Sequence, residues 1–169
     1  MRKFIYNSIV DKLKEMIDKN SQPVIRHFDI WNNNITYLQD EQPFFMPAVL
    51  IEFQPIQWRH QGNGVREAAV TVMLHVLIQR NAPTQNNQKY EDPGLCFFDL
   101  LTDINRCLHG HSKTSFNFGH DAVTATQSVT DHDFEEIQHH IEAFTCHVSD
   151  ASAMPDLETV RAGGIKVVI

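Results

Sequence analysis

The chain of 169 residues is long enough for one compact domain with its own core, and a composition of 42% apolar and 21% charged residues excludes a disordered or fibrous protein. The formal net charge of −7 argues against duplex nucleic acid as the main partner, because binding it calls for an excess of basic side chains. There is no Cys-x-x-Cys pair and no apolar run of 18 residues, so we expect reduced thiols in a soluble, cytoplasmic protein without a membrane span.

The first predicted element is an amphipathic helix from Phe4 to Lys19. Its apolar residues are spaced to form one stripe, at Ile5, Ile9, Leu13, Met16 and Ile17. Pro23 follows and cannot continue a helix. A short strand from Val24 to Trp31 comes next, and a polar loop then runs to Pro43.

Two long strands follow, one from Phe44 to Phe53 and one from Val65 to Arg80, with apolar side chains at alternate positions. The Gly62-Asn63-Gly64 sequence between them predicts a two-residue type I′ turn. That turn would pair three sets of apolar residues, Phe53 with Leu74, Ile51 with Val76 and Val49 with Ile78. Pro55 removes a backbone donor and predicts a bulge or an edge nearby.

A second helix is predicted to open at Asp92-Pro93 and to end at Gly110. Its apolar face is expected to hold Leu95, Phe98, Leu101, Ile104 and Leu108. After this helix we predict a loop over His111–Gly119 and a strand over Ala122–Val129. An acidic turn at Asp131-His132-Asp133 then leads into a last strand over Ile137–Val148.

This order of elements, with alternating strands, predicts an α+β fold. We expect a mainly antiparallel sheet with two helices packed on one face, in the order α-(β)-β-β-α-β-β. Residues 1–150 form the single domain and residues 151–169 a C-terminal extension. Within the extension, Ala151–Gly164 reads as a loop and Ile165–Ile169 as a strand that can join an edge of its own sheet or of a neighbouring subunit.

Ten histidines raise the question of a metal site. His139 and His140 are adjacent on a predicted strand and so point to opposite faces, which keeps them from binding one ion. His109 and His111 have no recognisable second pair of ligands, and His132 lies in the acidic turn. We predict no metal and no other cofactor, with a histidine-dependent metalloenzyme as the less favoured alternative.

Nucleophilic and phosphate-binding motifs are absent from the sequence: it contains no Gly-x-Ser-x-Gly, Walker, Gly-x-Gly-x-x-Gly or His-Glu-x-x-His pattern. The acidic pairs Asp131/Asp133 and Glu135/Glu136 are more typical of a solvated turn than of acid/base catalysis. We therefore expect no catalytic residue.

Large apolar residues near loops and at the C-terminus are candidates for an oligomer interface, since such groups are enriched in interfaces. They are Trp31, Phe44, Phe45, Trp58, Ile165, Val167 and Ile169. The alternative is that the aromatic ones cap the core.

Several segments resemble the tail terminator, or tail-completion, proteins of tailed bacteriophages and prophages. They are the first helix, PFFMPAVLIEF (Pro43 to Phe53), AAVTVMLHVLIQR (Ala68 to Arg80), DPGLCFFDLLTDI and the IQHHIEAFTCHVSD strand, within residues 4–150. The resemblance implies an α+β structural protein, without catalytic residues, that forms a homo-oligomeric ring, a hexamer. Such a ring caps the tail tube and joins it to the neck, first in the bacterial cytoplasm and then in the virion.

A ring-forming subunit needs two different complementary patches. Residues 1–90 carry 10 basic and 8 acidic side chains, whereas residues 91–169 carry 4 and 13, and this uneven charge is compatible with that need. The alternative from another class is a small ligand-binding or partner-binding α+β module, which would have a deep, partly apolar pocket and form no ring.

Overall fold

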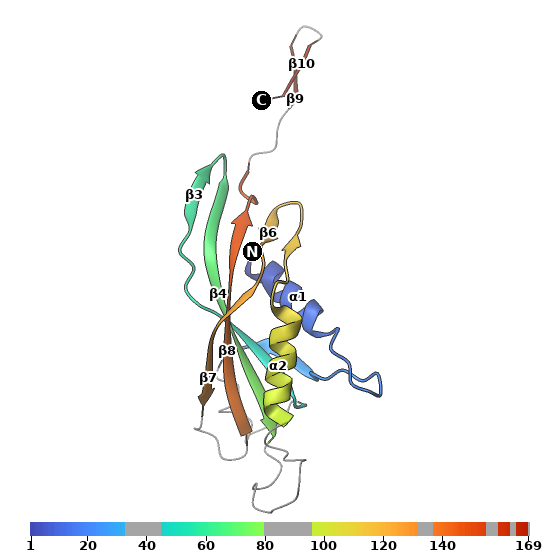
Figure 1. Ribbon diagram of the computed structural model, residues 1–169. Coiled ribbons are helices and arrows are strands. Elements are labelled where there is room, and N and C mark those ends of the chain that lie inside the picture. The colour runs from blue at the N-terminus through green and yellow to red at the C-terminus, as the bar shows by residue number, and fades with distance from the viewer. Residues whose placement is uncertain (33–44, 80–95, 132–136, 155–158, 163–164, 169) are drawn as a thin grey trace, which may run out of the picture.

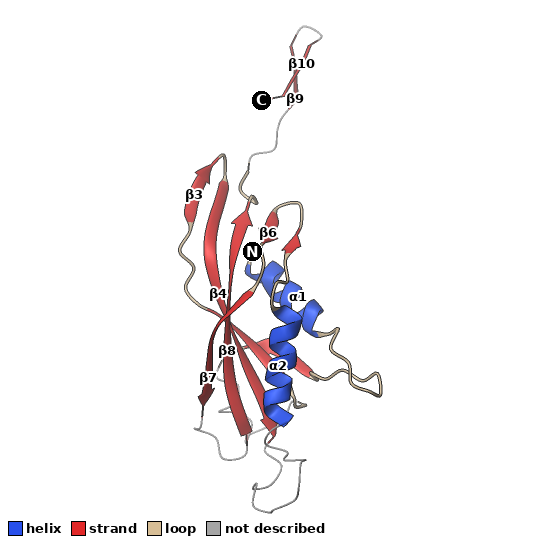
Figure 2. Cartoon of the chain, viewed as in Figure 1, coloured by secondary structure: helices blue, strands red, loops and turns tan. Residues whose placement is uncertain are grey.

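Two helices and a large, mostly antiparallel sheet make up the protein (Figure 1; Figure 2), so the predicted mixture of helices and antiparallel strands is confirmed. The computed structural model describes residues 1–32, 45–79, 96–131, 137–154, 159–162 and 165–168. Neither described helix has the length and hydropathy needed to cross a membrane.

The helices are α1 (Arg2–Leu13) and α2 (Cys96–Leu108). The strands of the main sheet are β1 (His27–Ile30), β2 (Ala48–Phe53), β3 (Arg59–Gly62), β4 (Val65–Gln79), β5 (Lys113–Thr114), β6 (Phe118–His120), β7 (Thr124–Asp131) and β8 (Ile137–Asp150). A separate two-stranded sheet holds β9 (Thr159–Ala162) and β10 (Ile165–Val168).

The long strands β4 and β8 lie at the centre of the sheet, whose order is β1-β2-β4-β8-β6-β5. They pair antiparallel from Arg66 opposite Asp150 to Gln79 opposite Ile137. β3 also pairs with β4, and β7 also pairs with β8. Of the described pairings only β1 with β2 is parallel, so the prediction of a mainly antiparallel sheet holds.

The Asn63-Gly64 turn between β3 and β4 is confirmed. Both residues have positive φ, 49° and 77°, and Gly62 pairs with Val65 across the turn. Gly64 is also required for packing, because a Cβ at this position would lie 2.1 Å from the backbone oxygen of Ala153.

The predicted register of the two long strands is wrong by two residues. Val49 faces Val76 and Ile51 faces Leu74, where the turn alone predicted Ile78 and Val76. The difference arises between the turn and β2: β3 contains an irregularity, and residues 54–58, with Pro55, separate β3 from β2. A shift of two residues leaves every side chain on its predicted face.

Helix α1 ends at Leu13, six residues before its predicted end. The carboxylate of Asp18 accepts hydrogen bonds from the backbone N–H groups of Asn20 and Gln22, both at 2.8 Å. Such local side-chain bonds stabilise a turn in competition with a helix. Ile17, predicted to belong to the apolar stripe, is consequently 60% exposed.

Helix α2 buries Phe97 and leaves Phe98, which was predicted to be on the apolar face, 56% exposed. The buried stripe starts at Phe97 and continues at Leu101, and each residue turns the helix by about 100°, so Phe98 lies beyond the stripe. The predicted helix end is confirmed by Gly110, whose φ is +80°. The predicted first turn, residues 92–95, lies outside the described residues.

Two predicted loops contain short hairpins. The segment from His111 to Gly119 holds β5 and most of β6, which pair antiparallel. The segment from Ala151 to Gly164 holds β9, which pairs with β10 so that Ala162 lies opposite Ile165. The prediction of a loop throughout Ala151–Gly164 is therefore wrong at residues 159–162, and Gly163 and Gly164 lie outside the described residues.

The main core combines both helices with alternate residues of the long strands. It includes Ile5 and Leu13 of α1, Ile104 of α2, Leu74 of β4 and Phe144 of β8. A smaller apolar cluster uses the intervening strand positions and holds Ala48, Leu50 and Leu77, with Trp31 and Ile137 packed against them. The strands therefore bury residues at both sets of alternating positions, and the second set also carries the polar groups described below.

Replacing the fully buried Leu74 with Ala should lower the free energy of unfolding by about 2–5 kcal/mol, because the truncation leaves a cavity in a packed core. Replacing the exposed Ile17 with Ala should cost less than about 1 kcal/mol. Urea titration followed by circular dichroism measures both. Equal costs for the two variants would contradict the observed arrangement.

Candidate functional site

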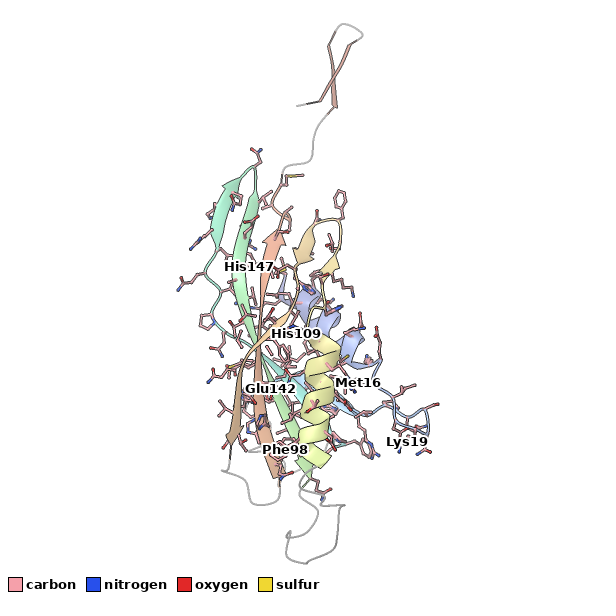
Figure 3. All side chains as sticks on the ribbon, viewed as in Figure 1. Met16, Lys19, Phe98, His109, Glu142 and His147 are labelled. Atoms are coloured by element: carbon pink, nitrogen blue, oxygen red, sulfur yellow. The ribbon has the colours of Figure 1, made fainter. Side chains whose placement is uncertain are left out.

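The buried polar side chains of the described residues belong mainly to histidine clusters. Within the described residues, every buried side-chain nitrogen or oxygen has a hydrogen-bond partner. Three clusters are built by residues far apart in sequence, and the second of them includes Glu142, which is labelled in Figure 3.

The first cluster is a hydrogen-bonded chain across four strands. Glu52 of β2 contacts Nε2 of His75 at 3.1 Å, and Nδ1 of His75 contacts Nε2 of His139 at 2.9 Å. Nδ1 of His139 then contacts Asp131 of β7 at 2.9 Å. Because the register places these residues on neighbouring strands and on one side of the sheet, the two imidazoles contact each other and lie between two carboxylates.

Trp31 stacks on this chain. Its ring lies 3.8 Å from the ring of His75, centroid to centroid, with an angle of 4° between planes. It is also stacked on His139 at 5.3 Å. Trp31, predicted as an interface residue, therefore packs within its own chain, which agrees with the alternative that it caps a buried region.

Both imidazoles of the chain favour the neutral form. Burial lowers the pKa of His75 to about 4, against a smaller opposing effect of Glu52, and burial likewise lowers the pKa of His139. Two neutral imidazoles supply two hydrogens to the three contacts of the chain. A hydrogen for the third contact would require one of the two imidazoles to take up a proton, and burial disfavours that charged form.

The second cluster lies between β7, β8 and α2, around His140. Ser128 contacts Nε2 of His140 at 2.8 Å and donates to Glu142 at 2.7 Å. Thr130 contacts Nδ1 of the same ring, and Asn105 of α2 donates to the second oxygen of Glu142.

This arrangement resembles a catalytic triad in composition only. In a triad the carboxylate orients the imidazole through the nitrogen that does not contact the nucleophile. Here Glu142 and Ser128 both contact Nε2 of His140, and a threonine contacts Nδ1. The geometry therefore fits a hydrogen-bonded support between the sheet and α2.

The third cluster joins α1 to the β5–β6 region. Ser8 contacts Nε2 of His111 at 2.9 Å and Nε2 of His120 at 2.8 Å, and Nδ1 of His120 donates to the backbone oxygen of Asp121. Burial, together with the nearby His120, lowers the pKa of His111. The cluster anchors the helix to the small hairpin.

The histidines considered as metal ligands do not converge. His139 and His140 have different partners, as their adjacency on a strand predicted. His111 contacts Ser8, whereas His109 is exposed at the end of α2 (Figure 3). His132 lies outside the described residues. Among the described side chains, no group of three His, Cys, Asp or Glu residues has the geometry to hold a metal ion.

Trp58, a second predicted interface residue, is half-buried beneath Arg66, whose guanidinium carbon lies 4.3 Å from the ring centroid. Arg66 donates two hydrogen bonds to the buried Asp150 at the end of β8. Burial alone would raise the pKa of Asp150, but hydrogen bonds from Ser152 and the contacts with Arg66 together lower it. This group of side chains fixes the point from which the C-terminal extension leaves the sheet.

The other predicted interface residues have different positions. Phe45 is 75% exposed, which suits an interface. Ile165 and Val167 belong to β10, and Phe44 and Ile169 lie outside the described residues.

Sequence reasoning missed Phe116, which among the described aromatic residues is the most exposed, at 98%, and lies at the tip of the β5–β6 hairpin. The turn is held by a hydrogen bond from the N–H of Ser115 to the oxygen of Phe118 at 2.7 Å. The next residue, Asn117, accepts from the N–H of Ala151, which places Phe116 at the same end of the molecule as the start of the extension. The sequence did contain an indication of this exposure, because Phe116 lies within a polar segment that was predicted to be a loop.

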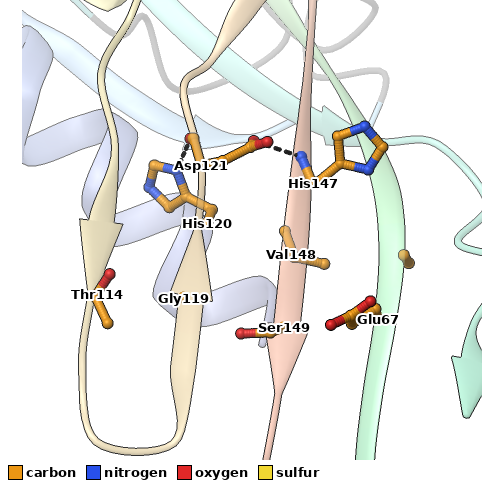
Figure 4. Close-up of a pocket in the computed structure, with 9 residues that line it drawn as sticks. Glu67, Thr114, Gly119, His120, Asp121, His147, Val148 and Ser149 are labelled. Carbon is orange, nitrogen blue, oxygen red and sulfur yellow. Dashed lines mark hydrogen bonds between the residues drawn. The ribbon is translucent and has the colours of Figure 1, made fainter. Parts of the chain in front are cut away.

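A pocket of about 470 Å³ lies beside this end, between β4, β6 and β8 (Figure 4). Its polar side chains include Glu67, Asp121, His147 and Ser149, and the Asp121 carboxylate accepts a hydrogen bond from the backbone N–H of His147. Ala68 and Val148 add apolar surface to the lining, so the pocket is bounded by polar and apolar groups together.

No protein-family model matches the chain, and no curated protein sequence matches it.

The neutral His75 makes stability depend on pH. Its pKa of about 4 in the folded state lies below the 6.5 of an unfolded histidine, so the unfolded chain binds more protons in this interval. The contribution is complete above about pH 6.5 and is lost as the pH falls toward 4. We expect the free energy of unfolding, from urea titrations at pH 7, 6 and 5, to fall more steeply for the natural chain than for His75→Gln. Parallel curves for the two proteins would contradict this assignment.

Purified protein without a histidine tag should contain no stoichiometric transition metal, because the buried histidines of the described residues are hydrogen-bonded in separate clusters. Elemental analysis provides the measurement. One tightly bound zinc or iron per chain would favour the metalloenzyme alternative instead.

Proposed function

We propose that the chain is a non-enzymatic structural protein of a phage or prophage tail, whose subunits form a ring that caps the tail tube and joins it to the neck. The observation that carries the assembly part of this proposal is the C-terminal hairpin. β9 and β10 pair with each other and, among the described strands, with no strand of the main sheet. An isolated two-stranded hairpin is at best marginally stable in water, so it calls for a partner surface.

The exposed end of the molecule supports the same proposal. Phe116 and the exposed Met154 lie at the end from which the extension leaves, next to the turn between β3 and β4. Large exposed apolar groups on rigid hairpins are typical anchors of protein interfaces. This end is the proposed contact with the tail tube or the neck.

The proposal includes the finer architecture predicted from the order and alternation of the elements, in which both helices pack on one face of the sheet, and it leaves the strand edges for neighbours. The mixed core of helix and strand residues supports it. The absence of catalytic activity is part of the proposal as well, supported by the geometry of the His140 cluster, in which serine and carboxylate share one imidazole nitrogen.

The full-length chain is expected to form a closed ring, a hexamer according to the resemblance, and to stop the elongation of tail tubes when added to growing ones. Multi-angle light scattering over a range of concentrations and negative-stain electron microscopy, alone and with tubes, measure these properties. A chain that stays monomeric at high concentration and does not bind tubes would contradict the proposal.

A further inference from the structure

Strand β7 presents the longest open edge of the main sheet. Among the described strands it pairs with β8 alone, and it is eight residues long, compared with four in β1 and two in β5. All of its residues except Asp131 are exposed. Proteins usually protect such an edge with lysine, proline or a bulge. The bulge of β7 lies between Ala125 and Gln127, so the stretch from Gln127 to Asp131 remains regular and contains neither lysine nor proline.

The C-terminal hairpin has two unmet requirements. Its two strands, in which Val160 lies opposite Val167, pair with no further described strand, and an isolated two-stranded hairpin is at best marginally stable in water. It also places Arg161 directly opposite Lys166, and like charges in facing positions destabilise a hairpin. A partner that offers an open strand edge and negative charge meets both requirements.

Charge complementarity favours β7 over the β5 edge, and the length of the strand favours it over β1. Residues 159–168 carry two basic and no acidic side chains. β7 ends at Asp131, and the sequence continues directly into Asp133, Glu135 and Glu136. The β5 edge, in contrast, carries Lys113.

The geometry favours the hairpin of a second subunit. Within one chain the extension leaves after Asp150, where Arg66 and the N–H of Ser152 hold the carboxylate. The acidic end of β7 lies beside His139, which is 11 residues away along β8, or about 36 Å of extended strand. A contact between two different surfaces of two copies is heterologous and can close into a ring.

We propose that the hairpin β9–β10 of one copy adds to the open edge of β7 of the next copy, with Arg161 and Lys166 near the acidic end of that strand. This inference rests on the proposed ring and names the surfaces that form it. It is a case of β-strand addition, in which backbone hydrogen bonds supply affinity and the charges select the register.

Hydrogen exchange on the full-length protein tests the contact. Peptides covering residues 124–131 and 159–168 should be exposed in the dilute monomer, and exchange should slow at least tenfold in the assembled form. An assembled ring without added protection at β7 would overturn this inference and leave the ring itself intact. Protection of β7 in the dilute monomer would show that each hairpin folds onto its own subunit and would also overturn it.

Charge variants test the complementarity. Gln127→Lys on β7, and Arg161→Glu combined with Lys166→Glu on the hairpin, should each weaken assembly at least tenfold by light scattering. Two controls change the same charges elsewhere: Thr114→Lys on the β5 edge, and Lys3→Glu with Lys14→Glu on the exposed side of α1. The controls should assemble as the natural chain does, and weakening by the controls to the same extent would overturn the proposal.

A mixing experiment identifies which surfaces meet. The Gln127→Lys chain keeps an intact hairpin, and the Arg161→Glu, Lys166→Glu chain keeps an intact β7 edge. Equal amounts of the two should therefore assemble together, although each alone is impaired, because the natural hairpin of one chain meets the natural edge of the other and the exchanged charges attract at the remaining contact. A mixture in which the chains stay separate would overturn the heterologous contact. Failure of the natural chain to assemble under any condition would remove the proposed function and this inference together.

Discussion

The pairing of β4 with β8 is the interaction on which the rest of the structure depends. β2 and β3 are bonded to β4, and β6 and β7 are bonded to β8, so the flanking strands of the main sheet take their positions from this pair. Each strand alternates core residues with polar or smaller residues on the opposite side. A slip of one residue would exchange Leu74 with His75 at the core and is therefore strongly disfavoured.

A slip of two residues keeps every side chain on its face of the sheet, so the pattern of apolar residues does not disfavour it. The buried polar bonds discriminate between such registers. His75 and His139 meet diagonally across the β4–β8 pair, and Arg66 meets Asp150 directly across it. A shift of two residues in either direction moves Arg66 away from its position opposite Asp150, and a shift that carries His139 away from His75 also breaks the contact between the two imidazoles. A buried polar atom left without a partner costs about 1–3 kcal/mol. These buried polar contacts therefore contribute to the choice of register.

The buried positions of the histidine clusters are compatible with the proposed assembly function, although the chain contains ten histidines. The described clusters turn their imidazole nitrogens toward one another, toward hydroxyl groups and toward carboxylates, and they lie within the sheet or between the sheet and the helices. The groups left for partners are of another kind: a bare strand edge at β7, a phenylalanine at a hairpin tip and a basic hairpin. Surfaces of this kind recognise other polypeptides.

Local features of the sequence determined much of the fold. Alternation over many residues identified β4 and β8, and the Asn63-Gly64 turn and Gly110 at the end of α2 required only local backbone preferences. The adjacency of His139 and His140 likewise predicted correctly that they separate to opposite sides of a strand.

Only the tertiary structure decided which residues meet. The two-residue shift between β2 and β4 preserves the alternating pattern, so the pattern could not reveal it. The chain from Glu52 to Asp131 joins four strands whose order in the sheet depends on packing, and the position of Trp31 on His75 follows from that order. Periodicity reports the direction of each side chain relative to its own strand, whereas a contact between distant residues depends on the free energy of the whole assembled sheet.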